Sequence, residues 1–162
     1  MNASRHATPS AAPHAAPGAT GSASHATASA RLTLGMAGPR PGLTALTAEL
    51  HYTSADPYAI TMTLNPGTAQ PVPWLLSRDL LRDALTAPQG LGDVQAWPAG
   101  GTGQQPAVLH IELSTPSGHA RLQAPARAIA AFLRRTYALV PAGRETDLPG
   151  FDAELAGLLS QA

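Results

Sequence analysis

Few residues in the chain have types and spacings suited to chemistry, and the clearest case is His110-x-Glu112. In a strand this spacing places the imidazole and the carboxylate on the same face. Zinc deaminases use such a His-x-Glu, but they also need a Pro-Cys-x-x-Cys motif, and the chain contains no cysteine. The pair is therefore predicted to belong to a polar strand face and not to a metal centre.

The remaining candidate sites are weaker. The Gly100–Gly103 run is not followed by the Gly-Lys-Ser/Thr of a phosphate loop, so it predicts a hairpin loop. Neither a Gly-x-Ser-x-Gly elbow nor a His-Glu-x-x-His pair occurs. The histidines at 6, 14 and 25 are too far apart along the chain for a good metal site. We therefore predict no catalytic, metal or cofactor-binding residue, no cofactor and no enzymatic activity.

Two groups of residues could contact other molecules. Trp74 and Trp97 are the only tryptophans, and each adjoins a proline in a predicted strand. Both are typical of core or sheet-edge packing, with a protein-contact hot spot as the alternative. The arginines of the last long helix, Arg127, Arg134 and Arg135, form either a solvated helix face or a small anion patch that Arg121 joins.

Charge and composition limit the class of protein. The chain of 162 residues has ten arginines, no lysine and ten acidic residues, so its net charge is zero. A neutral chain argues against nucleic-acid binding through bulk electrostatics. No apolar run is long enough for a membrane span, and no signal-peptide core follows the start. We expect a cytoplasmic protein.

The chain divides into a tail and one folded domain. Residues 1–30 are rich in alanine, proline and serine and contain no carboxylate, aromatic or branched aliphatic residue. Such a segment cannot bury enough apolar surface to offset its chain entropy, so it is predicted to be disordered. The domain is predicted to span residues 31–162.

The patterning of the domain predicts seven strands and three helices. Tyr58, Ile60, Met62 and Leu64 alternate with polar residues and are predicted to share one strand face. The Asn65–Thr68 sequence predicts a type II turn. The predicted order is strands 31–36, 43–52, 58–64 and 69–76, helix 78–85, strands 93–97, 107–114 and 118–124, then helices 125–139 and 152–160. This order indicates an α+β fold with antiparallel sheets, one long helix and two short ones.

Capping and turn residues support these boundaries. Ser77 is suited to cap the first helix, and Asp79 lies favourably in its first turn. Pro71 and Pro73 lack backbone donors, which predicts that their strand lies at a sheet edge. Pro125 suits the start of the long helix, where a missing N–H costs nothing.

A series of short motifs runs through the domain. The motifs are Tyr52-x-x-x-Asp56-Pro57-Tyr58-Ala59, Val72-x-Trp74, Ser77-Arg78-Asp79-Leu80-Leu81, Gly92-Asp93-Val94-x-x-Trp97-Pro98, Ala124-Pro125-Ala126 and Phe132-Leu133-x-Arg135-Thr136. In their order and spacing they resemble one family, the SsgA-like proteins of sporulating actinomycetes, and the resemblance runs from about Arg31 to the C-terminus. Ala84 stands where a glycine is expected, and the turn at residues 38–42 matches poorly, so the chain resembles a divergent paralogue.

The resemblance implies a non-enzymatic adaptor in sporulation-specific cell division. Such a protein would help to position or activate septum assembly, or septal and spore-wall peptidoglycan remodelling. The implied partners are division or cell-wall synthesis proteins, such as the tubulin-like FtsZ or another SsgA-like protein, and the implied location is the division septum. The resemblance also implies a whirly-like fold that assembles as a trimer. Under this interpretation Trp74, Arg78 and Trp97 are the candidate protein contacts.

The whirly-like fold also suggests an alternative, a single-stranded nucleic-acid-binding protein. Such proteins combine a basic groove with aromatic stacking platforms. Residues 31–162 hold nine arginines against ten acidic residues, and the whole chain has only seven aromatic residues. The composition therefore disfavours nucleic acid as a partner.

Overall fold

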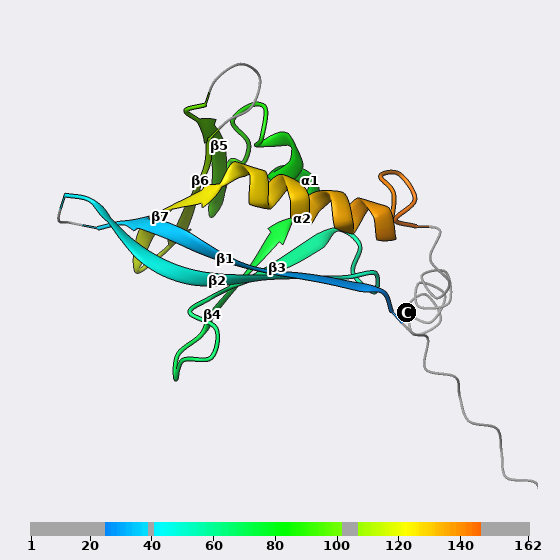
Figure 1. Cartoon of the computed structure of the whole chain (residues 1–162), viewed down its shortest axis with the longest axis horizontal. Helices are drawn as coiled ribbons and strands as arrows, with labels where there is room; N and C mark the ends of the chain where they lie inside the picture. The colour runs from blue at the N-terminus through cyan, green and yellow to red at the C-terminus, as the bar shows by residue number, and fades with distance from the viewer. Residues whose placement is uncertain (1–24, 39–40, 102–106, 147–162) are drawn as a thin grey trace, which may run out of the picture.

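A computed structural model describes residues 25–38, 41–101 and 107–146. Within them, seven strands and two helices follow one another in the order predicted (Figure 1). The elements are β1 (Thr27–Ala37), β2 (Leu43–Thr53), β3 (Ala59–Leu64), β4 (Val72–Ser77), α1 (Arg78–Asp83), β5 (Val94–Ala99), β6 (Val108–Thr115), β7 (Gly118–Pro125) and α2 (Ala126–Leu139).

All seven strands belong to one antiparallel sheet with the order β4-β3-β2-β1-β7-β6-β5. The prediction of antiparallel pairing is confirmed, but the strands form a single sheet. β1 pairs with β2 along its whole length. It pairs with β7 only over Gly35–Ala37, opposite Arg121–Gln123. The two halves of the sheet are therefore joined by a three-residue contact, beyond which β1 and β7 diverge.

Helix α2 covers one face of the sheet, which we call the inner face (Figure 1). Its predicted apolar stripe is confirmed, because Ile129, Phe132, Leu133 and Thr136 are all buried. The arginines at 134 and 135 are exposed. The opposite, outer face of the sheet carries the alternate strand residues, which are partly or fully exposed in the described part of the chain.

Strand β3 and the turn after it follow the pattern in the sequence. Ile60, Met62 and Leu64 are buried on the inner face. At the following turn the N–H of Thr68 donates to the carbonyl oxygen of Asn65 at 3.3 Å. Gly67 has φ +80°, as a type II turn requires. Tyr58 was predicted to share the buried face, but this was wrong: it precedes β3 and is 51% exposed.

The outermost strands of the sheet are β4 and β5. Pro73 lies within β4, so the predicted edge position of this strand is confirmed. Along β5, the backbone of Gln89 exchanges two hydrogen bonds with Ala96, at 2.8 and 2.9 Å. This bridge occupies the backbone groups of Ala96 that point away from β6.

The folded part begins earlier than predicted. Thr27–Ala30 were assigned to the disordered tail, yet they form the first four residues of β1. They pair with Leu50–Thr53 of β2, and Ala28 is only 4% exposed. Pairing with a distant strand therefore orders residues that carry little apolar signal of their own. Residues 1–24, the second half of the Gly100–Gly103 loop and the predicted helix 152–160 lie outside the described residues.

Candidate functional site

Arg78 occupies the centre of a buried polar cluster. It was predicted as a protein contact, but its side chain is only 1% exposed, so that prediction is wrong. Its guanidinium donates to Glu145 at 2.6 Å, to the Val140 carbonyl at 2.8 Å and to the Tyr52 hydroxyl at 3.1 Å. The Val140 carbonyl lies at the C-terminal end of α2, where carbonyls lack helical donors. Arg78 therefore ties the start of α1 to the end of α2.

Aromatic rings complete this cluster. The Arg78 guanidinium lies 4.2 Å from the ring centre of Tyr137 and 5.3 Å from that of Tyr52. These contacts place π-electron density against the charge in a water-excluded setting. Burial raises the pKa of Tyr52, although the nearby Arg78 charge opposes the rise. The Arg78 Nε atom is buried and has no hydrogen-bond partner among the described residues.

A second charged cluster lies at the surface beside α1. Arg82 donates to Asp83 at 2.7 Å and to Asp79 at 2.8 Å. The Tyr137 hydroxyl donates to Asp79 at 2.6 Å. Burial, with that hydrogen bond, raises the pKa of Tyr137 to about 12. The Arg82 hydrogen bond lowers the pKa of Asp83. Because each acid is already held by a cation, these groups are suited to join α1 to α2 rather than to transfer protons.

Trp74 lies on edge strand β4, opposite Met62 of β3, and packs against the core. It is only partly exposed. Its neighbours on β4 are more accessible, because Leu75 is 67% exposed and Val72 is 46% exposed. The apolar surface available at this edge therefore comes mainly from Leu75 and Val72, neither of which was predicted as a protein contact.

Trp97 lies on the outer face of β5 and stacks on His110 of β6. The ring centres are 5.3 Å apart and the planes are 11° from parallel. The Arg121 guanidinium lies 5.5 Å from the Trp97 ring centre and donates to Glu112 at 2.8 and 3.0 Å. His110 and Glu112 thus share the outer face, as their spacing predicted. The described residues contain no group of three or more possible metal ligands.

The alternative in which Arg121 joins the helix arginines in one anion patch is wrong. Arg121 lies on the outer face of the sheet, whereas Arg127, Arg134 and Arg135 belong to α2 on the inner side. Arg135 donates to the Ser29 carbonyl of β1 at 2.9 Å. The arginines are therefore divided between two faces of the molecule.

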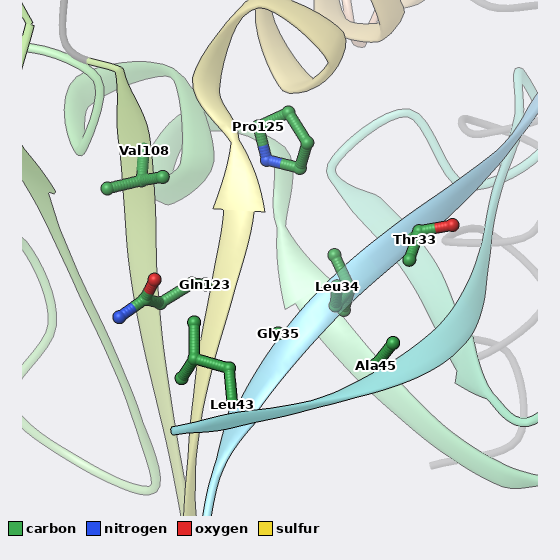
Figure 2. Close-up of a pocket in the computed structure, with 8 residues that line it drawn as sticks. All are labelled: Thr33, Leu34, Gly35, Leu43, Ala45, Val108, Gln123 and Pro125. Carbon is green, nitrogen blue, oxygen red and sulfur yellow. The ribbon is translucent and has the colours of Figure 1, made fainter. Parts of the chain in front are cut away.

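Two adjoining hollows on the outer face form what we call the β1–β7 groove. The first, of about 290 Å³, surrounds Gly35 at the point where β1 and β7 diverge. Figure 2 shows Leu43 and Gln123 beside one another there, with Val108 and Pro125 nearer to α2. The second hollow, of about 400 Å³, is lined by Ala37, Gly38, His119 and Arg121.

Sequence reasoning missed the β1–β7 groove because its two sides are distant along the chain. Gly35 and Gln123 become neighbours only through strand pairing. The local signal is Gly35 within a predicted strand, because a glycine inside a strand marks a bulge or a close approach of another group to the backbone. Here a Cβ atom on Gly35 would come within 2.8 Å of Leu43 Cδ1, so the glycine lets Leu43 lie across β1.

No described helix is long and apolar enough to cross a membrane.

Comparison with known proteins gives the family. The model of the family described as Streptomyces sporulation and cell division protein, SsgA, matches residues 46–145. The sporulation-specific cell division protein SsgB of Frankia casuarinae is 42% identical over 135 residues, which are 83% of this chain and 93% of that protein. SsgB of Streptomyces coelicolor is 45% identical over 115 residues, covering 71% of this chain and 82% of that protein.

Solved structures agree with the sequence comparisons. A structure from a study of SsgB mutations and longitudinal cell division during sporulation of Streptomyces coelicolor matches with a TM-score of 0.71 and 42% identity, over 78% of this chain and 98% of that one. The structure of the SsgA-like sporulation-specific cell division protein of Thermobifida fusca matches with a TM-score of 0.72 and 37% identity. The match covers 84% of this chain and 98% of that one. The single antiparallel sheet with its two described helices is therefore an SsgA-like fold, and the chain belongs to the SsgA family of sporulation and cell division proteins.

Proposed function

We propose that this protein is a non-enzymatic adaptor in sporulation-specific cell division. It would help to position or activate septum assembly, or septal and spore-wall peptidoglycan remodelling. The observation that carries the proposal is the match to SsgB, at 42% identity over 98% of a solved chain. A likeness that spans the whole domain makes a shared cellular role the simplest interpretation.

The use of the charged side chains supports a role without catalysis. Arg78 and Glu145 pair with each other inside the domain, where they hold the start of α1 against the segment that follows α2. Glu112 is held by Arg121, and Asp79 and Asp83 are held by Arg82. General acids and bases need a reachable proton and a matched pKa, and these ion-paired carboxylates are poorly placed for that task.

An adaptor acts through its surfaces, and two regions are suited to contact. One is the β4 edge, with exposed Leu75 and Val72 beside the half-buried Trp74. The other is the outer face around Trp97 and His110. We propose division or cell-wall synthesis proteins as partners, with FtsZ and another SsgA-like protein as the first to test. A homotrimer of whirly-like subunits, located at division septa, is part of the same proposal.

The proposal is tested by imaging a fluorescent fusion in sporulating hyphae of the source organism, with a deletion strain alongside. We expect ladders or foci at division sites, together with septation or spore-shape defects in the deletion strain. Diffuse or nucleoid-bound fluorescence with normal septa would overturn the proposed function. A fusion carrying Trp97→Ala tests the outer face, with Leu91→Ser as the control because Leu91 is fully exposed and packs against nothing in the described core.

Nucleic-acid binding provides the contrasting outcome. The sheet arginines form neutral pairs, Arg31 with Glu49 and Arg121 with Glu112, so they give the outer face no excess of positive charge along which a phosphate backbone could bind. We therefore expect fluorescence anisotropy with labelled single-stranded oligonucleotides to show no binding at low salt. Binding that weakens steeply with added salt would instead favour the nucleic-acid interpretation.

A further inference from the structure

We propose that the β1–β7 groove binds a short extended peptide segment of a partner protein. The segment would carry an aliphatic side chain and, two residues further along, a carboxylate. This inference rests on the proposed adaptor function, because it supplies the recognition surface that an adaptor needs. It names the chemistry of the partner at one site on the outer face.

One end of the groove is suited to an aliphatic side chain. Leu43, Ala45, Val108 and Pro125 present carbon atoms around a hollow of about 290 Å³. Leu43 is 51% exposed, although it is a large apolar residue beside this hollow. An aliphatic group seated there would remove its own surface and that of Leu43 from water, which is favourable.

The floor of this end is apolar. Leu43 lies across Gly35, and Ala45 and Ala37 beside the glycine have only a methyl group. An approaching peptide therefore meets the Leu43 side chain and two methyl groups. Gln123, opposite Gly35, offers an amide that can both donate to and accept from a peptide backbone.

The other end of the groove is suited to a carboxylate. Arg121 donates to Glu112 through Nε and Nη2. Its Nη1 has no hydrogen-bond partner within the described ranges, so it can donate to a second carboxylate. His119, which lines the same hollow, adds a ring nitrogen that can donate to the same carboxylate.

The spacing between the two ends sets the spacing in the ligand. Gly35 pairs with Gln123, and Ala37 pairs with Arg121. The two hollows are thus one strand repeat of two residues apart, about 7 Å along the strands. An extended peptide lying along β7 places residues i and i+2 on its sheet-facing side. Residues i and i+3 would point to opposite sides and could not occupy both hollows.

The test is an NMR titration of the ¹⁵N-labelled full chain with two serine–glycine peptides. One peptide carries leucine and aspartate two positions apart, and the other carries them three positions apart. We expect the first to shift the Trp97 indole signal and to bind about tenfold more tightly than the second. The Trp74 indole serves as an internal control, because Trp74 faces the core side of the sheet.

Two variants test the ends of the groove separately. Gly35→Val places a side chain where Leu43 now lies, and Arg121→Gln removes the cation. Each should weaken binding of the first peptide about tenfold, whereas Thr61→Val, on the outer face of β3 away from the groove, should not. Circular dichroism melting confirms that each variant is folded, and Arg121→Lys replaces Arg121→Gln if that variant is not.

Three outcomes would overturn the inference. They are the absence of any Trp97 shift, equal binding of the two peptides, and full binding by folded Gly35→Val. If only an oligonucleotide shifts the Trp97 signal, the groove binds nucleic acid instead. If the signal shifts only when the protein concentration is raised, the groove binds a second copy of the chain. Failure of the proposed function is distinguishable from failure of the groove proposal. In that case the fluorescent fusion does not reach septa although the peptide binds the groove.

Discussion

The buried pair of Arg78 and Glu145 makes the most quantitative prediction. Their side chains are 1% and 9% exposed, and the ionic contact is 2.6 Å. Replacing Arg78 by Met removes the cation and leaves the Glu145 carboxylate, the Tyr52 hydroxyl and the Val140 carbonyl without their donor. Removing one partner of a buried pair costs about 3–5 kcal/mol. We therefore expect Arg78→Met to lower the free energy of unfolding by that amount.

Urea unfolding measures this loss directly, and thermal unfolding should show a fall of about 10–20 °C for a domain of this size. The matched control is Arg31→Met. Arg31 pairs with Glu49 at 3.3 Å, but these side chains are 68% and 39% exposed. Removal of an exposed pair costs at most about 1 kcal/mol.

A double-mutant cycle separates the pair from its surroundings. Arg78→Met with Glu145→Met leaves neither charge buried alone, so the double variant should be less destabilised than the two single effects together. The coupling expected for groups in direct contact is about 0.5–3 kcal/mol. The reasoning is refuted if Arg78→Met costs no more than Arg31→Met, or if the coupling between Arg78 and Glu145 is zero within error.

Three further predictions concern the packing of the domain. Phe132→Ala should cost about 3–5 kcal/mol in urea unfolding, because the ring is 1% exposed, and a negligible change would place it outside the core. A chain starting at Arg31 should melt below one starting at His25, because it lacks the first four residues of β1, and equal melting would contradict their packing. Stability should fall as pH rises from 10 through about 12, because the folded state raises the pKa of Tyr137 above its usual 10.0 and so favours the neutral phenol. Tyr137→Phe should flatten this fall, and an unchanged slope would contradict the assignment.

Local patterning predicted most of the elements. Three of the signals act over only a few residues and can therefore be recognised in the sequence. They are the apolar alternation in β3, the glycine at turn position 67 and the helix cap at Ser77. The apolar stripe of α2 is equally local. Element types and their order follow from such signals, and the structure agrees with them to within a few residues.

Features that depend on distant residues were not predictable in the same way. The burial of Arg78 requires Val140 and Glu145, which lie more than sixty positions away. The start of β1 is set by pairing with β2, since Thr27–Ala30 carry little apolar signal. The β1–β7 groove exists because the first strand lies beside the last, an adjacency that no local pattern encodes.

The sheet ends also bear on how many copies of this chain can be gathered at one place. A free strand edge is a template for cross-β aggregation. Here Pro73 has no backbone N–H to offer on β4. On β5 the N–H and the carbonyl of Ala96 are already bonded to the backbone of Gln89. Copies crowded together would therefore have little opportunity to join edge to edge into a self-propagating fibre. At high local concentration, these two blocked positions would disfavour the growth of a continuous sheet from one molecule to the next.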